Sequence, residues 1–221
     1  MIRPFGEAAL LAEVGSSARA QAVAATLRAD PIPGVVEVVA GLVSLLVELD
    51  PLAIDVGRVA AALEERVQQI NDAVPVGRAR TIPVVYGGEH GPDLADVATV
   101  CGLSEAGVIE RHAAADLRVL FLGFAPGFAY LGELPEALRL SRLATPRAHT
   151  PAGSVAIAGA MSGIYPADLP GGWRVIGRTP VVLFDPHRDP PAYLAPGDAV
   201  RFEPISPDEW KARAGPPADW R

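Results

Sequence analysis

The stretch Phe121-Leu-Gly-Phe-Ala-Pro-Gly-Phe-Ala-Tyr-Leu-Gly132 decides how the second half of the chain folds. It continues an apolar run that predicts a strand over residues 119–124, and it breaks at a proline–glycine pair. Proline fixes φ and lacks an N–H, while glycine tolerates positive φ, so the pair indicates a tight turn. An ordinary hairpin does not need so many aromatic rings. We therefore expect either a plug at one end of a barrel or a wall facing a ligand or partner, built from Phe124, Pro126, Gly127, Phe128 and Tyr130.

Downstream of this stretch, short apolar segments alternate with turns rich in glycine and proline. The clearest segments are 151–159, 173–180 and 196–202. Some of them show period-two alternation of apolar and polar residues, and we expect no helix between 119 and 205. Short strands between recurring turns are typical of closed or nearly closed β-barrels, which hide the edges of their sheets.

The first 80 residues have a different pattern, in which strands and helices alternate. Strands are expected over 8–14, 35–39 and 43–49, and helices are expected to begin after Ser16 or Ser17 and after Asp55. With a last strand over 82–86, the order is that of a ferredoxin-like βαββαβ domain. That last strand can belong to either domain.

The expected organisation is therefore α+β, with an α/β domain over 1–80 and a β-barrel domain over 81–205. Residues 87–118 are expected to form a helical insertion in the second domain, with helix starts near Asp93 and Ser104. Residues 206–221 are expected to form a short helix or a partly disordered tail, which Trp210 and Trp220 could hold in place.

Composition narrows the class of protein. The net charge is −7 and no basic run occurs, so nucleic acid is not an expected partner. No apolar run is long enough to cross a bilayer, no signal peptide is evident, and Cys101 is the single cysteine, so a cytoplasmic protein without membrane contact is expected. Lys211 is the single lysine, which excludes a phosphate-binding P-loop lysine in the core, and no glycine-rich nucleotide motif is present.

Three residues are candidates for catalysis, namely Glu89, His90 and His149. Glu89 and His90 follow a strand together with Asp93, and such groups could transfer protons or bind a metal, although Asp93 could also simply cap a helix. His149 precedes Ser154, but that serine lacks the G-x-S-x-G context of a nucleophile and could be a turn residue. The four histidines never occur at zinc-binding spacing, so no metal is expected.

The candidate anion-binding residues are Arg147, Arg174 and Arg178. An arginine fork can bind a carboxylate or a phosphate through two hydrogen bonds. Equally, these arginines could form salt bridges on the rim of the barrel. Asp198, in a Pro-Gly-Asp sequence, is expected to be a turn residue.

Together these segments resemble one protein family over residues 82–205. The phrases that carry the resemblance are FLGFAPGFAYLG, ATPR, PAGSVAIAG, GIYP, PGGWRVIGRTP, LFD and PGDAVRF. The family is that of the B-type subunit of ATP-dependent 5-oxoprolinase, also described as allophanate hydrolase subunit 1 and as a Kip-type inhibitor of a sporulation kinase. The resemblance implies a cyclophilin-like antiparallel β-barrel and a carboxyltransferase domain.

The resemblance also implies a reaction, the ATP-dependent opening of 5-oxo-L-proline to L-glutamate by this chain with the A-type and C-type subunits of 5-oxoprolinase. Arg147 and Arg178 are then the first candidates to contact the carboxylate or a phosphate. ATP is expected to be used by the complex and not bound by this chain alone, which is expected to be inactive by itself. The family usually has other residue types at His90 and His149, which weakens a specific role for either.

The sequence is equally compatible with two other functions. One is inhibition of a sensor histidine kinase without catalysis, in which case the aromatic turn would be a docking surface. The other is allophanate hydrolysis. The shared phrases build the shared fold, so the sequence does not separate these functions.

Overall fold

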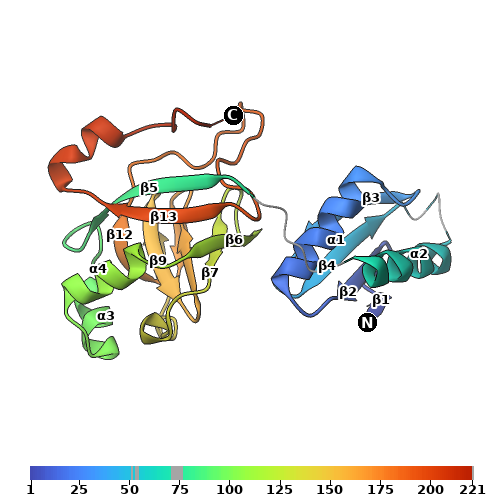
Figure 1. The fold of residues 1–221 in the computed structure, drawn as a ribbon, viewed down its shortest axis with the longest axis horizontal. Helices are drawn as coiled ribbons and strands as arrows, with labels where there is room; N and C mark the ends of the chain where they lie inside the picture. Colours follow the sequence, from blue (N-terminus) through green and yellow to red (C-terminus); the bar gives the residue numbers. More distant parts are fainter. Residues whose placement is uncertain (51, 53–54, 71–76, 221) are drawn as a thin grey trace. The chain divides into compact units, whose positions relative to one another are not determined.

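The computed structural model describes residues 1–50, 52, 55–70 and 77–220 (Figure 1). The chain divides into two compact units, Met1–Val76 and Gly77–Arg221. The first contains a sheet with two helices, and the second is built around a closed β-barrel. The mixed α+β fold predicted from the sequence is therefore confirmed.

The first unit is a four-stranded antiparallel sheet with strand order β1-β2-β4-β3. The elements in chain order are β1 (Ile2–Pro4), β2 (Ala9–Glu13), α1 (Ser17–Ala29), β3 (Val35–Ala40), β4 (Ser44–Leu49) and α2 (Val56–Gln69). The strand predicted over 82–86 lies in the barrel. The position beside β2 is filled instead by β1, which carries a proline at its end, as edge strands tolerate.

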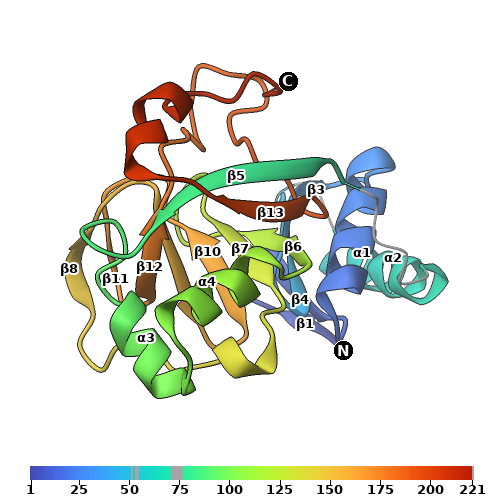
Figure 2. The ribbon, with the colours of Figure 1, turned by 60° about the vertical axis from the view of Figure 1, so that its left-hand side comes forward.

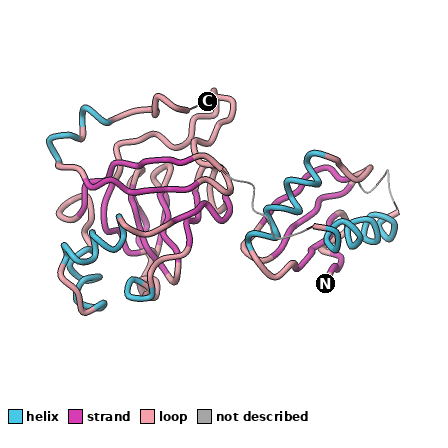
Figure 3. The backbone as a smooth tube through the Cα atoms, viewed as in Figure 1, coloured by secondary structure: helices cyan, strands magenta, loops and turns pink. Residues whose placement is uncertain are grey.

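Both helices pack on one face of this sheet, and they share one core with it (Figure 3). Leu10, Leu45 and Val47 point from the strands into this core, and Leu27 and Leu63 join them from the helices. The helices begin where capping groups were predicted. Ser16 accepts a hydrogen bond from the Arg19 N–H, and Asp55 accepts one from the Gly57 N–H at 2.9 Å.

The second unit contains a closed barrel with strand order β10-β7-β6-β13-β5-β12-β9 (Figure 2). Its strands are β5 (Ala79–Tyr86), β6 (Leu117–Leu122), β7 (Ala129–Gly132), β9 (Ser154–Ala158), β10 (Met161–Ile164), β12 (Arg174–Arg178) and β13 (Ala199–Pro204). A separate pair, β8 (Arg147–Thr150) and β11 (Leu169–Gly171), lies outside the barrel order.

One pair of barrel strands departs from the antiparallel pattern that the family resemblance implied. The last strand, β13, runs antiparallel to β6 but parallel to β5. Since β13 lies between two strands of opposite direction, it must be parallel to one of them. Side-chain alternation is the same in both directions, so the sequence held no signal for this.

Helices α3 (Leu94–Cys101) and α4 (Glu105–Ala113) lie between β5 and β6 in the chain and pack against the barrel (Figure 2). The Ser104 hydroxyl caps α4 by accepting from the Gly107 N–H at 3.0 Å. A 3-10 turn, η1 (Glu136–Leu138), follows β7. None of the helices in the described ranges is long and apolar enough to span a membrane.

The described part of the C-terminal tail is tied to the barrel and contains two 3-10 turns, η2 (Pro207–Glu209) and η3 (Lys211–Arg213) (Figure 1). Gly215 forms a bridge with Val181. The Trp220 ring is buried, and its Nε1–H donates to the Pro190 carbonyl at 3.1 Å. Trp210 also contacts the barrel unit, through His90 and Arg178, so both tryptophans hold the tail in place.

Candidate functional site

The aromatic residues around Pro126 form one connected cluster with two rings from distant loops. Phe128 is buried at its centre, where its ring meets Tyr130 edge-on at 4.9 Å between centroids. It meets Tyr165 at 5.2 Å and Trp173 at 5.8 Å. We call the whole set the aromatic wall, and its members are Phe121, Phe124, Phe128, Tyr130, Tyr165 and Trp173.

Glycines explain why these rings can pack so closely. A Cβ on Gly163 would come within 2.9 Å of the Phe128 ring, and one on Gly171 would overlap the Tyr165 hydroxyl. Gly127, at φ +79, takes a conformation that other residues avoid. The packing of the aromatic wall therefore requires glycine at positions 127, 163 and 171.

One edge of the aromatic wall is exposed. Phe124 is 59% exposed and has φ +68, the single positive φ of a non-glycine residue in the described ranges. Such a conformation costs about 1–2 kcal/mol and is often found at functional sites. Phe121 and Tyr130 of the same wall stack on each other at 4.2 Å and are half-buried. Of the predicted wall, Pro126 is exposed, while Gly127 packs on Phe184.

Arg142 lies beside this wall, although nothing in the sequence singled it out. Its guanidinium carbon is 6.0 Å from the centroid of the Trp173 ring. Burial raises the pKa of Tyr130 and of Tyr165, and the Arg142 charge acts on both in the opposite direction. Its spacing from Trp173 in sequence carries no periodic signal, so its place beside the ring depends on the tertiary fold.

Arg147 is committed to an internal ion pair. Its Nη2 lies 2.5 Å from Oδ1 of Asp93, and the other Asp93 oxygen accepts from the Val175 N–H at 2.7 Å. Asp93 therefore ties the start of α3 to β8 and β12, and its carboxylate makes no helix-capping hydrogen bond. The second terminal nitrogen of Arg147, Nη1, is buried without a partner among the described residues.

The other two predicted arginines are also engaged. Arg174 forms an ion pair with Asp96, and its Nε donates to the Ser141 carbonyl at 3.2 Å. Arg178 donates from Nε to the Ala152 carbonyl at 2.7 Å and lies over the Trp210 ring at 5.6 Å. The rim salt bridges considered as an alternative are thus present for Arg147 and Arg174.

The three candidate catalytic residues lie at two separate places. His90 stacks on Trp210 at 4.8 Å, and its Nε2 is 3.7 Å from the largely exposed Glu89 carboxylate. His149 contacts Asp168 at 3.1 Å on the surface. A hydrogen bond from the Ala152 N–H, followed by the one from His149, lowers the pKa of Asp168. Within the described ranges, no three His, Cys, Asp or Glu side chains are placed to hold a metal.

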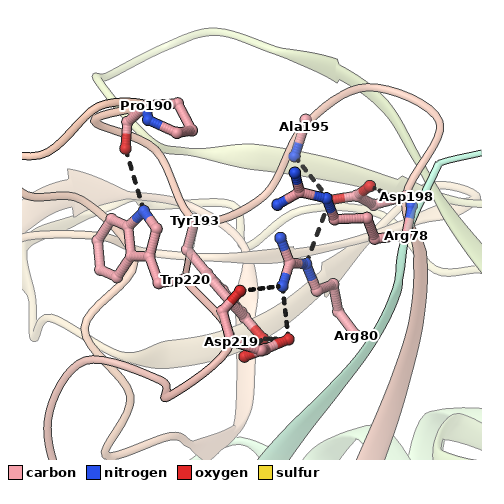
Figure 4. Close-up of polar contacts among 8 residues, drawn as sticks. All are labelled: Arg78, Arg80, Pro190, Tyr193, Ala195, Asp198, Asp219 and Trp220. Carbon is pink, nitrogen blue, oxygen red and sulfur yellow. Dashed lines mark hydrogen bonds and ion pairs between the residues drawn. The ribbon is translucent and has the colours of Figure 1, made fainter.

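A buried arginine cluster, which sequence patterns did not reveal, joins β5 to the tail (Figure 4). The Arg80 side chain donates from Nη1 to Asp219 at 2.5 Å, and its Nε is 3.6 Å from Asp198. Its guanidinium carbon lies 4.3 Å from the centroid of the Tyr193 ring. Asp198 also accepts from the Arg78 N–H at 2.7 Å, so the predicted turn aspartate is an ion-pair partner as well.

This cluster shifts the ionisation of its members. Burial disfavours the Arg80 charge, but its hydrogen bond to Asp219 and the nearby charges outweigh this and raise its pKa. Burial also raises the pKa of Tyr193, to about 12, and its hydrogen bond to Asp219 adds to the shift. For Asp219, burial is outweighed by the hydrogen bonds from Arg80 and Tyr193, so its pKa is lowered.

A second buried polar group lies around His112, where α4 packs on strands of the barrel. Its Nδ1 is 2.8 Å from the Tyr86 hydroxyl, its Nε2 is 2.9 Å from the Ser162 hydroxyl, and its ring stacks on Phe202 at 4.5 Å. Burial lowers the pKa of His112 to about 3 and raises that of Tyr86. The imidazole is therefore neutral, and its role here is to satisfy two buried hydroxyls.

A hollow of about 640 Å³ adjoins Arg80. It is lined by Ala79, Arg80, Thr81, Ala113, Ala114, Ala115, Asp116, Ala199, Val200 and Arg201. None of the predicted catalytic or anion-binding residues contributes to it. The aromatic wall with Arg142 is the better candidate site because it combines an exposed and strained phenylalanine, Phe124, with an arginine that has no carboxylate partner among the described residues.

Known proteins resemble this chain along most of its length. The family model described as carboxyltransferase domain, subdomain C and D, matches residues 1–194. The chain is 50% identical over 177 residues to the B-type subunit of 5-oxoprolinase from Escherichia coli O157:H7, covering 78% of this chain and 79% of that relative. It is 39% identical over 228 residues to the same subunit from Bacillus subtilis (strain 168), covering 96% and 95%.

A solved structure agrees with the fold. The crystal structure of TTHA0988 matches with a TM-score of 0.78 at 37% identity, over 93% of this chain. This chain spans 40% of the length of that protein.

Proposed function

Because the chain belongs to the family of B-type 5-oxoprolinase subunits, we propose that it works with the A-type and C-type subunits to convert 5-oxo-L-proline to L-glutamate at the cost of ATP. The matches cover most of the length of both bacterial relatives. The chain is thus one subunit of an ATP-dependent enzyme.

The chemistry of the substrate explains the use of ATP. A lactam is stabilised by resonance and is a poor electrophile. Phosphorylation of its amide oxygen would create a centre that water attacks more readily. The sequence contains no glycine-rich phosphate loop with a lysine, so we assign nucleotide binding to another subunit.

The observation that supports a shared active site is the separation of the candidate catalytic groups. Glu89 and His90 lie by Trp210, whereas His149 lies by Asp168, and in the described part of the chain neither histidine makes a ring contact with the aromatic wall. The wall offers binding surface without a carboxylate or imidazole of its own. We therefore propose that the C-type subunit docks on the barrel near the Pro126–Gly127 and Gly171–Gly172 loops and helps to complete the site.

The test is reconstitution from purified subunits. Glutamate formation and ATP hydrolysis are measured with 5-oxoproline for this chain alone, for the A-type and C-type subunits together, and for all three. We expect turnover only with all three, and co-elution of this chain with the C-type subunit in size exclusion. Turnover by this chain alone, or by the other two without it, would contradict the proposal.

A genetic experiment provides the second arm. Deletion of the coding region should abolish growth on 5-oxoproline as the nitrogen source, and expression of this chain should restore it. Allophanate serves as the control substrate in the reconstituted assay, where we expect no turnover. Growth of the deletion strain on 5-oxoproline would instead favour a role in allophanate hydrolysis or kinase inhibition.

A further inference from the structure

Arg142 is an exposed arginine whose charge is not neutralised by a neighbour. Across residues 1–50, 52, 55–70 and 77–220 its guanidinium makes no hydrogen bond or ion pair, and it lies against the Trp173 ring. The other arginines of this region are paired with acids. These pairs are Arg139 with Glu133, Arg147 with Asp93 and Arg174 with Asp96.

The charge of Arg142 reaches the tyrosines of the aromatic wall and is not balanced by an acid in the described residues. The charges of Arg142 and Arg147 both act on Tyr165, and that of Arg142 acts on Tyr130 as well. The nearby acid at the start of α3, Asp93, is already bound by Arg147 and by the Val175 N–H. An anion that approached Arg142 would therefore meet an unopposed cation.

Flat apolar surface lies next to this cation. Phe121 and Tyr130 stack on each other, and Gly123 carries no side chain that could cover them. A Cβ at Gly123 would lie 3.8–3.9 Å from both rings, so any larger residue would cover this pair. Phe124, exposed in its left-handed conformation, belongs to the same aromatic wall through edge-on contacts with Phe128 and Tyr165.

We propose that Arg142 binds the carboxylate of 5-oxoproline while the exposed edge of the aromatic wall supports its lactam ring. This inference rests on the proposed function. A guanidinium fork matches a carboxylate through two parallel hydrogen bonds, and aromatic faces accept a flat ring. Contact with Trp173 restrains the arginine before the ligand arrives, which reduces the entropy lost on binding. The lactam then remains free to face the groups supplied by the other subunits.

The test uses the complex of all three subunits with Arg142→Gln in this chain. Loss of a charge-assisted hydrogen bond corresponds to roughly a 10- to 100-fold rise in KM for 5-oxoproline. We expect kcat to change less than about threefold, and Arg142→Lys to restore part of the affinity. The matched control is Arg201→Gln, which removes another exposed arginine, on β13, and should leave KM unchanged.

A substrate analogue makes the assignment specific. The wild-type complex should prefer 5-oxoproline over 5-oxoprolinamide, which lacks the carboxylate, and Arg142→Gln should abolish this preference while Arg201→Gln keeps it. An unchanged preference in Arg142→Gln would overturn the inference, as would loss of the complex in size exclusion, which would make Arg142 a docking residue. A wild-type complex without 5-oxoproline turnover would instead refute the proposed function, and the inference with it.

Discussion

Two arginines of the barrel unit each lie above an aromatic ring, yet they differ in almost every other respect. The Arg80 side chain is 4% exposed, lies over Tyr193, and faces two carboxylates. Arg142 is exposed, lies over Trp173, and has no carboxylate partner in the described part of the chain. Two side chains of the same type thus lie in opposite environments, one buried and paired and the other exposed and unpaired among the described residues.

The difference shows how burial decides what an arginine can do. A buried guanidinium must be paired, because an unpaired buried charge costs several kcal/mol, so Arg80 is committed to structure. Its partners come from the turn before β13 and from the tail, so it ties three segments together (Figure 4). An exposed guanidinium is stabilised by water, so Arg142 can remain unpaired and exchange that water for a ligand.

The largest effect on the free energy of unfolding is expected from removing the charge of the buried Arg80. Arg80→Gln leaves the buried Asp198 without its cation and releases Asp219, so the free energy of unfolding should fall by about 3–5 kcal/mol. Urea titration followed by circular dichroism measures this. Arg201→Gln is the control, with an expected change within about 0.5 kcal/mol. A loss below about 1 kcal/mol for Arg80→Gln would show that the cluster is not a structural tie.

The buried and neutral His112 provides a second test, because it makes the stability of the protein depend on pH. Burial lowers the pKa of His112 to about 3 from 6.5, so between these values protons bind the unfolded chain but not the native one. Stability should therefore fall as pH decreases below 6.5, by up to about 1.4 kcal/mol per pH unit from this group.

The measurement is urea unfolding at several pH values between about 7 and 4 for the wild type and for His112→Gln. Glutamine retains hydrogen-bonding capacity toward Tyr86 and Ser162 but does not titrate. The free energy of unfolding of His112→Gln should therefore change less with pH than that of the wild type, whatever the stability of the variant at neutral pH. Equal slopes for the two proteins would mean that the native imidazole accepts a proton.

A smaller effect is expected at the exposed edge of the aromatic wall. Phe124 has φ +68, which alanine tolerates poorly and glycine tolerates well. We expect Phe124→Gly to be more stable than Phe124→Ala by about 1 kcal/mol, the reverse of the usual order of these residues. Ala144→Gly, at an exposed position without positive φ, should show the usual order. The usual order at position 124 would argue against strain there.

The smallest effect is expected for Arg142 itself. Because the side chain is exposed and has no ion pair or hydrogen bond in the described ranges, Arg142→Gln should change the free energy of unfolding by no more than about 0.5 kcal/mol. The same urea titration used for Arg80→Gln provides the comparison. A loss as large as that of Arg80→Gln would mean that the contact with Trp173 is structural.

Much of the fold follows from local pattern. The Pro126–Gly127 turn, the caps Ser16, Asp55 and Ser104, and the short strands after 119 were all predictable. The sequence did not predict which strands pair with each other. The short β1 completes the first sheet, and β13 runs parallel to β5, because both facts depend on which segments meet in space.

The candidate site likewise contains residues that the sequence indicated and residues that only the structure could identify. The aromatic residues of 124–130 stood out by their density, and the structure gathers them with Tyr165 and Trp173. The arginines could not be ranked, because their partners are distant. Arg147 meets Asp93 across 54 residues, and Arg174 meets Asp96 across 78.

By itself, the sequence determined the α+β class, the barrel, the aromatic turn and the family resemblance, since periodicity, turn residues and composition act over short stretches of chain. Tertiary structure decided which arginines form ion pairs within the barrel unit and that Arg142 has no carboxylate partner in the described part of the chain. The reason is physical: an ion pair forms between groups that the fold brings together, as with Arg80 and Asp219 across 139 residues, and the sequence between them does not encode that meeting locally.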